Sequence, residues 1–250
     1  MSVKKLKKPV LATGSVVFWI AVWHVLASAI NRRLILKIPL PLETFEEFLI
    51  DCKTLSFWQT VGVSVLHILS GFLVGALLGA LCGFLSERYF VFRVFSSPIH
   101  HLVKTVPVAA LIILAWLWIP SNVLPSFISF LMVLPIVWSH TSSGVAAIDE
   151  KLVEMAKVYS KTDREILFEV KLPLVSPFLR TGCITALSIA WKAGVAAEVI
   201  SSPTGSLGAL LNGAKTNINY PQVFAVTLTV VLLSVALEKI LKLLWKEQKR

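Results

Sequence analysis

Long apolar runs alternate with short polar segments along most of the chain. Each run is close to the roughly 20 residues that an α-helix needs to cross the hydrocarbon core of a bilayer. The runs cover residues 12–30, 61–85, 101–119, 123–141, 179–200 and 222–244. The pattern predicts an all-α polytopic membrane protein with about six transmembrane helices in one domain, residues 1–250.

The third run is the least regular. Pro107 and Pro120 leave only twelve residues between them, and proline removes a backbone donor and clashes with the preceding helical turn. We expect this helix to begin before Pro107 or to cross the membrane incompletely.

A charged segment separates the fourth and fifth runs. The composition of residues 149–159 favours a helix, and Leu152, Met155 and Ala156 fall on one face of it. The sequence therefore predicts a short amphipathic helix outside the membrane.

A second short helix is predicted after a break at Ser160 and Lys161. Thr162, followed three positions later by Glu165, forms the pattern of a capping box, which marks a helix start. Pro173 and the proline four residues after it are expected to end this helix before the fifth run. The result is a pair of helices that meet at an elbow.

Basic residues predict the orientation. With six spans, the N-terminus, residues 86–100, residues 142–178 and the C-terminus share one side of the membrane. That side is rich in basic residues. On the other side, acidic residues balance the basic ones. Because cytoplasmic segments of membrane proteins carry an excess of Lys and Arg, the first side is predicted to be cytoplasmic. The cytoplasmic basic residues include Lys4, Lys5, Lys7, Lys8, Arg88, Arg93, Lys246, Lys249 and Arg250, and the opposite side holds Arg32, Arg33, Lys37, Lys53 and Lys215. Residues 1–11 would be a cytoplasmic tail and residues 201–219 an external loop.

Composition narrows the function classes. The 250 residues are 56% hydrophobic and 15% charged, with a net charge of +10. The basic residues sit at the ends of apolar runs, so topology explains them better than nucleic-acid binding does. The cysteines, Cys52, Cys82 and Cys183, have no metal-site or disulfide spacing.

No catalytic or nucleotide-binding pattern is present in the sequence. It contains no phosphate-binding glycine loop and no nucleophile constellation. We therefore expect no catalytic residues, no metal and no cofactor bound by this chain. The lysine-rich start followed by an apolar run also resembles a signal peptide, but an uncleaved first helix is favoured because the run holds His24 and two tryptophans.

Glycines recur every four residues in the second run. Gly71, Gly75, Gly79 and Gly83 form one smooth stripe on a helix, and small residues allow another helix to approach closely. We expect tight packing inside the bundle, with a subunit contact as the alternative.

Charged residues inside the fifth run are candidates for a translocation path. Trp191 and Glu198 are seven residues apart and share a helical face, whereas Lys192 lies about 240° around the helix from Glu198 and cannot pair with it. Each charge would face a cavity or pair with another span. His67 in the second run is expected to be a packed, hydrogen-bonded histidine.

The elbow segment resembles the cytoplasmic EAA loop of ABC importer permeases. Glu154, Met155 and Ala156 occupy its first three places, Ser160 stands where the pattern has glycine, and Pro173 follows thirteen positions later. Other stretches are similar to permeases of the nitrate, sulfonate and taurine importer family, namely WQTVGVSVLHILSGFLVGALLGALCGFLSE, SSPIHHLVKTVPVAALIILAWLW, TALSIAWKAGVAAEVI and GSLGALLNGAK.

This resemblance implies a type I importer permease of a bacterial inner membrane. It implies a second permease copy, a cytoplasmic ATPase dimer that uses ATP and Mg²⁺, and an external substrate-binding protein. The elbow, with Glu154 at the contact and Ala156 small for close approach, would couple the chain to the ATPase. Small anions or sulfonates are the implied substrates, with heterocyclic vitamin precursors as an alternative.

Two other classes compete with this interpretation. A stand-alone secondary carrier or channel predicts inverted repeats or several intramembrane carboxylates, neither of which is evident in the sequence. A membrane scaffold would not require an elbow with a capping box between prolines.

Overall fold

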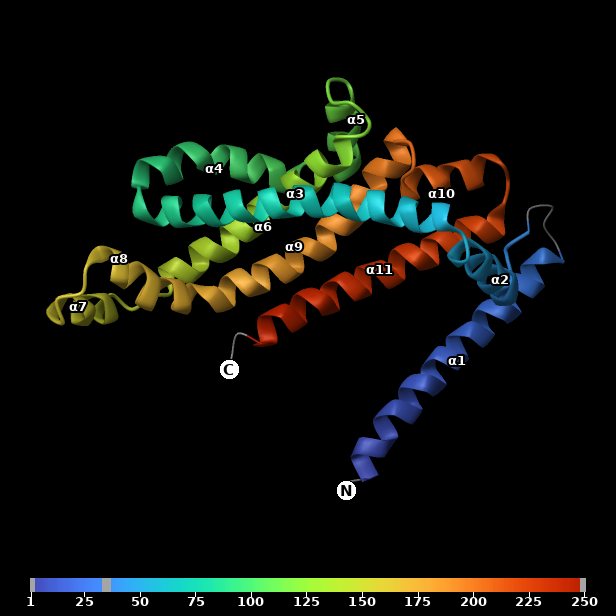
Figure 1. Ribbon diagram of the computed structural model, residues 1–250, viewed down its shortest axis with the longest axis horizontal. Coiled ribbons are helices and arrows are strands. Elements are labelled where there is room, and N and C mark those ends of the chain that lie inside the picture. The colour runs from blue at the N-terminus through green and yellow to red at the C-terminus, as the bar shows by residue number, and fades with distance from the viewer. Residues whose placement is uncertain (1–2, 33–36, 248–250) are drawn as a thin grey trace. The chain divides into compact units, whose positions relative to one another are not determined.

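The computed structural model describes residues 3–32 and 37–247, all in helices and their connections, without strands in these ranges. Arg33, Lys249 and Arg250, used above for orientation, lie outside the described residues. The elements are α1 Val3–Asn31, α2 Pro41–Cys52, α3 Leu55–Arg88, α4 Phe90–Thr105, α5 Val108–Trp116, α6 Leu124–Ala146, α7 Glu150–Val158, α8 Asp163–Glu165, the π-helical turn η1 Ile166–Lys171, α9 Leu172–Ser201, α10 Leu207–Thr216 and α11 Tyr220–Glu247 (Figure 1).

The lengths of the apolar helices confirm the polytopic all-α class. Within the described chain, five helical segments are long and apolar enough to cross a membrane: Thr13–Asn31, Leu55–Arg88, Leu124–Ala146, Asp163–Ser201 and Tyr220–Trp245. A sixth crossing is available if α4 and α5 together form one bent span.

The third predicted run is not a single helix. It divides between α4 and α5, which meet at an angle of 103°. Val106 is extended (φ −71°, ψ 132°) and Pro107 occupies the N-cap of α5. The proline ring disfavours helical geometry in the residue before it, so the bend falls at this dipeptide.

The chain packs as two compact units. One holds the described residues up to Gln59 together with Leu210–Val231, and the other holds Thr60–Ala209 and the described residues from Leu232 onward. The assignment of residues 1–250 to one permease domain stays a prediction.

The first unit contains an amphipathic helix that the sequence patterns did not predict. This helix, α2, begins with Pro41 in its first turn, and the Glu43 carboxylate accepts from the Leu40 N–H at 2.9 Å. The Trp58 indole donates to the Cys52 carbonyl at the end of α2. Burial, followed by the charge of Glu47, raises the pKa of Asp51 in its last turn.

In the second unit, α6 and α9 lie side by side (Figure 1). Buried side chains of α5, α6 and α9 form an apolar core between these helices. It comprises Ile112, Leu124, Ile128, Met132, Ala193 and Ala197. The short helices α7 and α8 lie at one end of the α6–α9 pair (Figure 1).

The capping box is confirmed, but the helix that it starts does not end at the prolines. The Thr162 N–H donates to Glu165 Oε2 at 2.7 Å, and the Glu165 N–H donates to Thr162 Oγ1 at 3.3 Å. From there the chain stays helical through η1 and α9. Pro173 is the second residue of α9 and directly follows the π-helical turn η1, so the chain passes through it without a helix end. Pro177 lacks the N–H that would bond the Pro173 carbonyl, and the Ser176 hydroxyl donates to that carbonyl instead at 2.9 Å.

Candidate functional site

The elbow between α7 and α8 turns through a left-handed residue. The Asp149 carboxylate caps α7 by accepting from the Lys151 N–H at 3.0 Å. At the other end, Ser160 has φ 56°, and the Lys161 N–H donates to the Ala156 carbonyl at 3.2 Å. This conformation suits glycine and costs other residues about 1–2 kcal/mol. Ser160 therefore adopts the geometry for which glycine is the usual residue.

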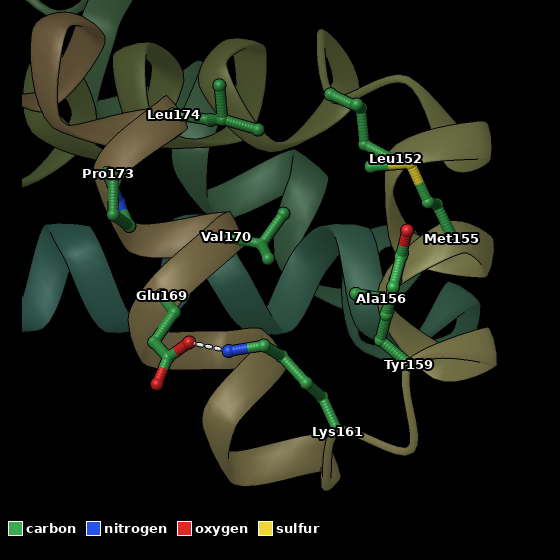
Figure 2. Close-up of a pocket in the computed structure, with 9 residues that line it drawn as sticks. All are labelled: Leu152, Met155, Ala156, Tyr159, Lys161, Glu169, Val170, Pro173 and Leu174. Atoms are coloured by element: carbon green, nitrogen blue, oxygen red, sulfur yellow. Dashed lines mark hydrogen bonds and ion pairs between the residues drawn. The ribbon is translucent and has the colours of Figure 1, made fainter.

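A shallow apolar groove of about 380 Å³ lies between the two arms of the elbow (Figure 2). Lys161 and Glu169 form an ion pair across it. The lining residues are Leu152, Met155, Ala156, Tyr159, Lys161, Glu169, Val170, Pro173 and Leu174.

Ala156 is only 7% exposed and lines the groove between the two arms of the elbow. Its small size suits the contact between α7 and η1. Its expected place near an ATPase stays a prediction.

Apolar side chains of α7 and its C-cap are exposed although this helix lies outside the candidate spans. Met155, Val158 and Tyr159 are 53%, 81% and 75% exposed. Met155 and Tyr159 line the groove, and Glu154 is exposed beside them. Apolar side chains gathered on a surface outside the lipid region are typical of a protein interaction site.

A buried carboxylate of the second unit joins residues of α3, α9 and the first turn of α10. Glu198 in α9 is fully buried, and its Oε2 accepts from the Ser64 hydroxyl of α3 at 2.6 Å and from the Gly208 N–H of α10 at 3.2 Å. Its Oε1 lies 3.1 Å from His67 Nδ1. The Leu207 N–H donates to the Ser64 hydroxyl at 2.8 Å, so both groups cap the start of α10.

Gly208 allows this arrangement. A Cβ at that position would overlap with the backbone and Cβ of Glu198. The glycine therefore lets the first turn of α10 lie directly against α9. His67 is the hydrogen-bonded histidine that the sequence predicted.

The family of the chain follows from comparison with known proteins. A family model described as the binding-protein-dependent transport system inner membrane component matches residues 71–249. The chain belongs to this family. The resemblance to importer permeases is thereby confirmed, and the protein is an importer permease of the ABC type. The likeness of the elbow to an EAA loop stays a prediction.

Individual relatives agree with this assignment. The permease is 30% identical over 188 residues to a probable ABC transporter permease protein of Brucella melitensis, covering 74% of this chain and 76% of that protein. It is 27% identical over 210 residues to a putative aliphatic sulfonates transport permease protein of Bacillus subtilis, covering 82% and 74%. A chain of the MetNI methionine ABC transporter, solved in an inward-facing conformation, shares the fold with a TM-score of 0.54 and 17% identity, covering 76% of this chain and 91% of that chain.

The residues predicted to lie on the translocation path do not come together on a surface. Trp191 is 1% exposed, and Glu198 is fully buried, so neither lines an open passage in this conformation. Lys192 is exposed and does not pair with Glu198. Their place on the path stays a prediction.

The glycine stripe of α3 meets α6 along its length. A Cβ added to Gly71 would overlap with the Ser126 carbonyl, and one added to Gly75 would lie 2.8 Å from Val133 Cβ. Corresponding distances are 2.7 Å from Gly79 to the Leu134 carbonyl and 2.6 Å from Gly83 to Thr141 Cβ. The stripe thus allows two helix backbones of the permease to approach closely.

Sequence reasoning missed a polar cluster between α4 and α6. Lys104 Nζ donates to the Ser139 hydroxyl at 3.0 Å, and His100 Nε2 lies 3.1 Å from the same oxygen. The sequence did contain a feature that could have indicated this cluster. Lys104 is a charged residue within the third apolar run, four positions after His100.

Proposed function

We propose that this permease imports a small anion, of which sulfonates are the model class, and that α7, the elbow and α8 couple it to an ATPase. The observation that carries the coupling role is a group of exposed apolar side chains on α7, a helix outside the candidate spans. The anionic class is supported by the likeness to a putative aliphatic sulfonates permease.

The geometry of the elbow suits the transmission of force. A capped helix start, an ion pair between Lys161 and Glu169 and the burial of Ala156 fix α7 against η1. Because η1 continues into α9 without a break, displacement of α7 by a partner would move a helix that crosses the membrane. Glu154, Met155, Ser160, Lys161, Thr162 and Pro173 belong to this proposed coupling element.

The proposed assembly contains two copies of the permease, a cytoplasmic ATPase dimer and an external substrate-binding protein, in the lipid of a bacterial inner membrane. Both termini and the elbow face the cytoplasm. ATP and Mg²⁺ are used by the ATPase subunits, and this chain contributes transport rather than catalysis. Trp191, Lys192 and Glu198 are proposed to act at the gate through their positions in α9.

The test is a graded charge series at Glu154 in the assembled importer. We propose that basic groups of the ATPase face Glu154. Glu154→Lys would then bring like charges together at the contact, which costs several kcal/mol. We expect Glu154→Lys to abolish uptake and substrate-stimulated ATP hydrolysis, with Glu154→Gln in between. The measurements are sulfonate uptake in cells and ATP hydrolysis by the purified complex.

Two controls make the result interpretable. Expression and melting temperature of the Glu154→Lys permease should match the parent, because the side chain is exposed. Ala156→Trp is unsuitable as a contact probe, because that residue is buried in its own chain. Parental transport by Glu154→Lys would show that the exposed face of α7 is only a solvated surface.

A further inference from the structure

We infer that Lys104, with His100 and the Ser139 hydroxyl, forms an anion-binding site on the translocation path, one that takes the sulfonate-type head group of the substrate. The inference rests on the proposed import of anions. It concerns a site at the bend between α4 and α5, on the face that α4 turns toward α6.

The first step is the position of Lys104 within a candidate span. α4 and α5, Phe90–Thr105 and Val108–Trp116, together are apolar enough to form one bent span. Lys104 lies in the last turn of α4, two residues before the extended Val106. The ammonium therefore stands at the break inside this candidate span.

The second step is the lack of a counter-ion. None of the ion pairs among the described residues includes Lys104, whose ammonium bonds the neutral Ser139 hydroxyl. Arg93, in the first turn of the same helix, differs in this respect, because it pairs with Glu87 at 3.5 Å. An exposed, uncompensated ammonium inside a membrane span is costly unless it faces water, a partner or a charged solute.

The third step is the orientation of the donors. Ser139 donates its own proton to the Pro135 carbonyl at 2.9 Å, which leaves its oxygen to accept from Lys104. His100 is held against α6, with its ring 4.7 Å from that of Trp138 and its Nε2 3.2 Å from the Pro135 carbonyl. The Lys104 side chain is therefore steered along α6 while it remains exposed.

The charge pattern selects the class of ligand. A lysine ammonium has three donor protons and no acceptor, and rings of Lys or Arg are the usual device of anion-selective pores. Sulfonate oxygens would accept hydrogen bonds from this ammonium. The cluster lies next to the bend at Val106 and Pro107, where the candidate span is broken.

The first experiment measures anion binding at the site and does not require transport. His101→Cys, an exposed position three residues before Lys104 on the same face of α4, is made in the full importer with Lys104 kept and with Cys52, Cys82 and Cys183 replaced by alanine. Reconstituted vesicles are treated with a membrane-impermeant thiol reagent. We expect modification, slowed about tenfold by millimolar methanesulfonate and not by choline chloride at equal ionic strength, and we expect Lys104→Gln in the same background to remove this protection. No modification, or modification that methanesulfonate does not slow, would mean that Lys104 faces lipid or another protein surface and would overturn the assignment.

The second experiment measures methanesulfonate uptake by the same complex. Lys104→Gln should lower the uptake about tenfold or more, and Lys104→Arg should retain most of it because the positive charge is kept. Lys239→Gln, the same charge removal on the exposed surface of α11, is the matched control and should transport as the parent does. Parental uptake by Lys104→Gln, or no methanesulfonate uptake by the parent, would contradict the site.

The two proposals fail in different ways. Loss of the importer function would appear as an absence of substrate-stimulated ATP hydrolysis in the parent complex. The thiol-protection result does not depend on ATP hydrolysis and therefore decides the anion site by itself.

Discussion

Replacing Glu198 with alanine should destabilise the permease by stranding buried donors. The carboxylate accepts from the Ser64 hydroxyl and from the Gly208 N–H, both at hydrogen-bonding distance, in a fully buried position. Glu198→Ala removes the acceptor and leaves both donors without water to replace it. α10 would also lose one of the two groups that cap its first turn.

The magnitude follows from the two donors. Each buried donor left unpaired costs about 1–3 kcal/mol, so the two together cost about 2–6 kcal/mol. In a chain of this length, 1 kcal/mol shifts Tm by about 2–4 °C, which gives an expected fall of about 4–24 °C. Glu198→Gln keeps the volume and one acceptor oxygen for both donors, so it should cost about 1 kcal/mol.

Thermal unfolding of the purified permease in detergent is the assay. Glu154→Ala removes an exposed carboxylate and serves as the control, with a Tm equal to that of the parent. A Glu198→Ala protein that melts within about 2 °C of the parent would refute the capping role. A Glu198→Gln protein as unstable as the alanine variant would show that the negative charge, rather than hydrogen bonding, stabilises the cluster.

Three further predictions concern other parts of the chain. Gly75→Leu should lower the yield and Tm of the permease, because its side chain would collide with Val133 of α6; parental values would mean that the stripe does not need close packing. Asp163→Cys in a cysteine-free background should resist an impermeant thiol reagent in intact cells and react in inverted vesicles, and reaction in intact cells would reverse the proposed orientation. Ser160→Gly should keep full transport and raise the stability of the elbow slightly, because glycine adopts φ 56° without strain, whereas a loss of transport would reveal a role for the hydroxyl.

The elements with strong local signals were predictable from the sequence. The apolar runs gave the long helices, and the spacing of Thr162 and Glu165 located a helix start that the structure reproduces. Glycine periodicity in α3 identified a smooth face, although only the fold shows that α6 occupies it. These patterns involve residues that are neighbours within one helix, so they can be recognised without knowledge of the tertiary structure.

The sequence-based predictions were wrong or incomplete where hydrogen bonds from other residues decide the structure. Proline predicted a helix end at residues 173–177, but a neighbouring serine hydroxyl satisfies the carbonyl that Pro177 leaves unpaired. Glu198 was singled out as a charge within an apolar run, yet its partner Ser64 lies 134 positions away and its partner Gly208 belongs to the next helix. Period and composition carry no information on such pairings.

The helix is continuous from Asp163 to Ser201, and this continuity affects how a movement of the elbow would be transmitted. One end of this helix packs against α7 at the elbow, and the other presents Glu198 to the start of α10. A helix broken at Pro173 would absorb a displacement of α7 at the break, whereas a continuous one carries it along its axis. The π-helical turn η1 is the place where the hydrogen-bond ladder departs from the α-helical pattern, and such turns often occur at functional sites. Movement of the elbow should therefore reach α10 through one helix, with η1 as the point at which the direction of that movement can change.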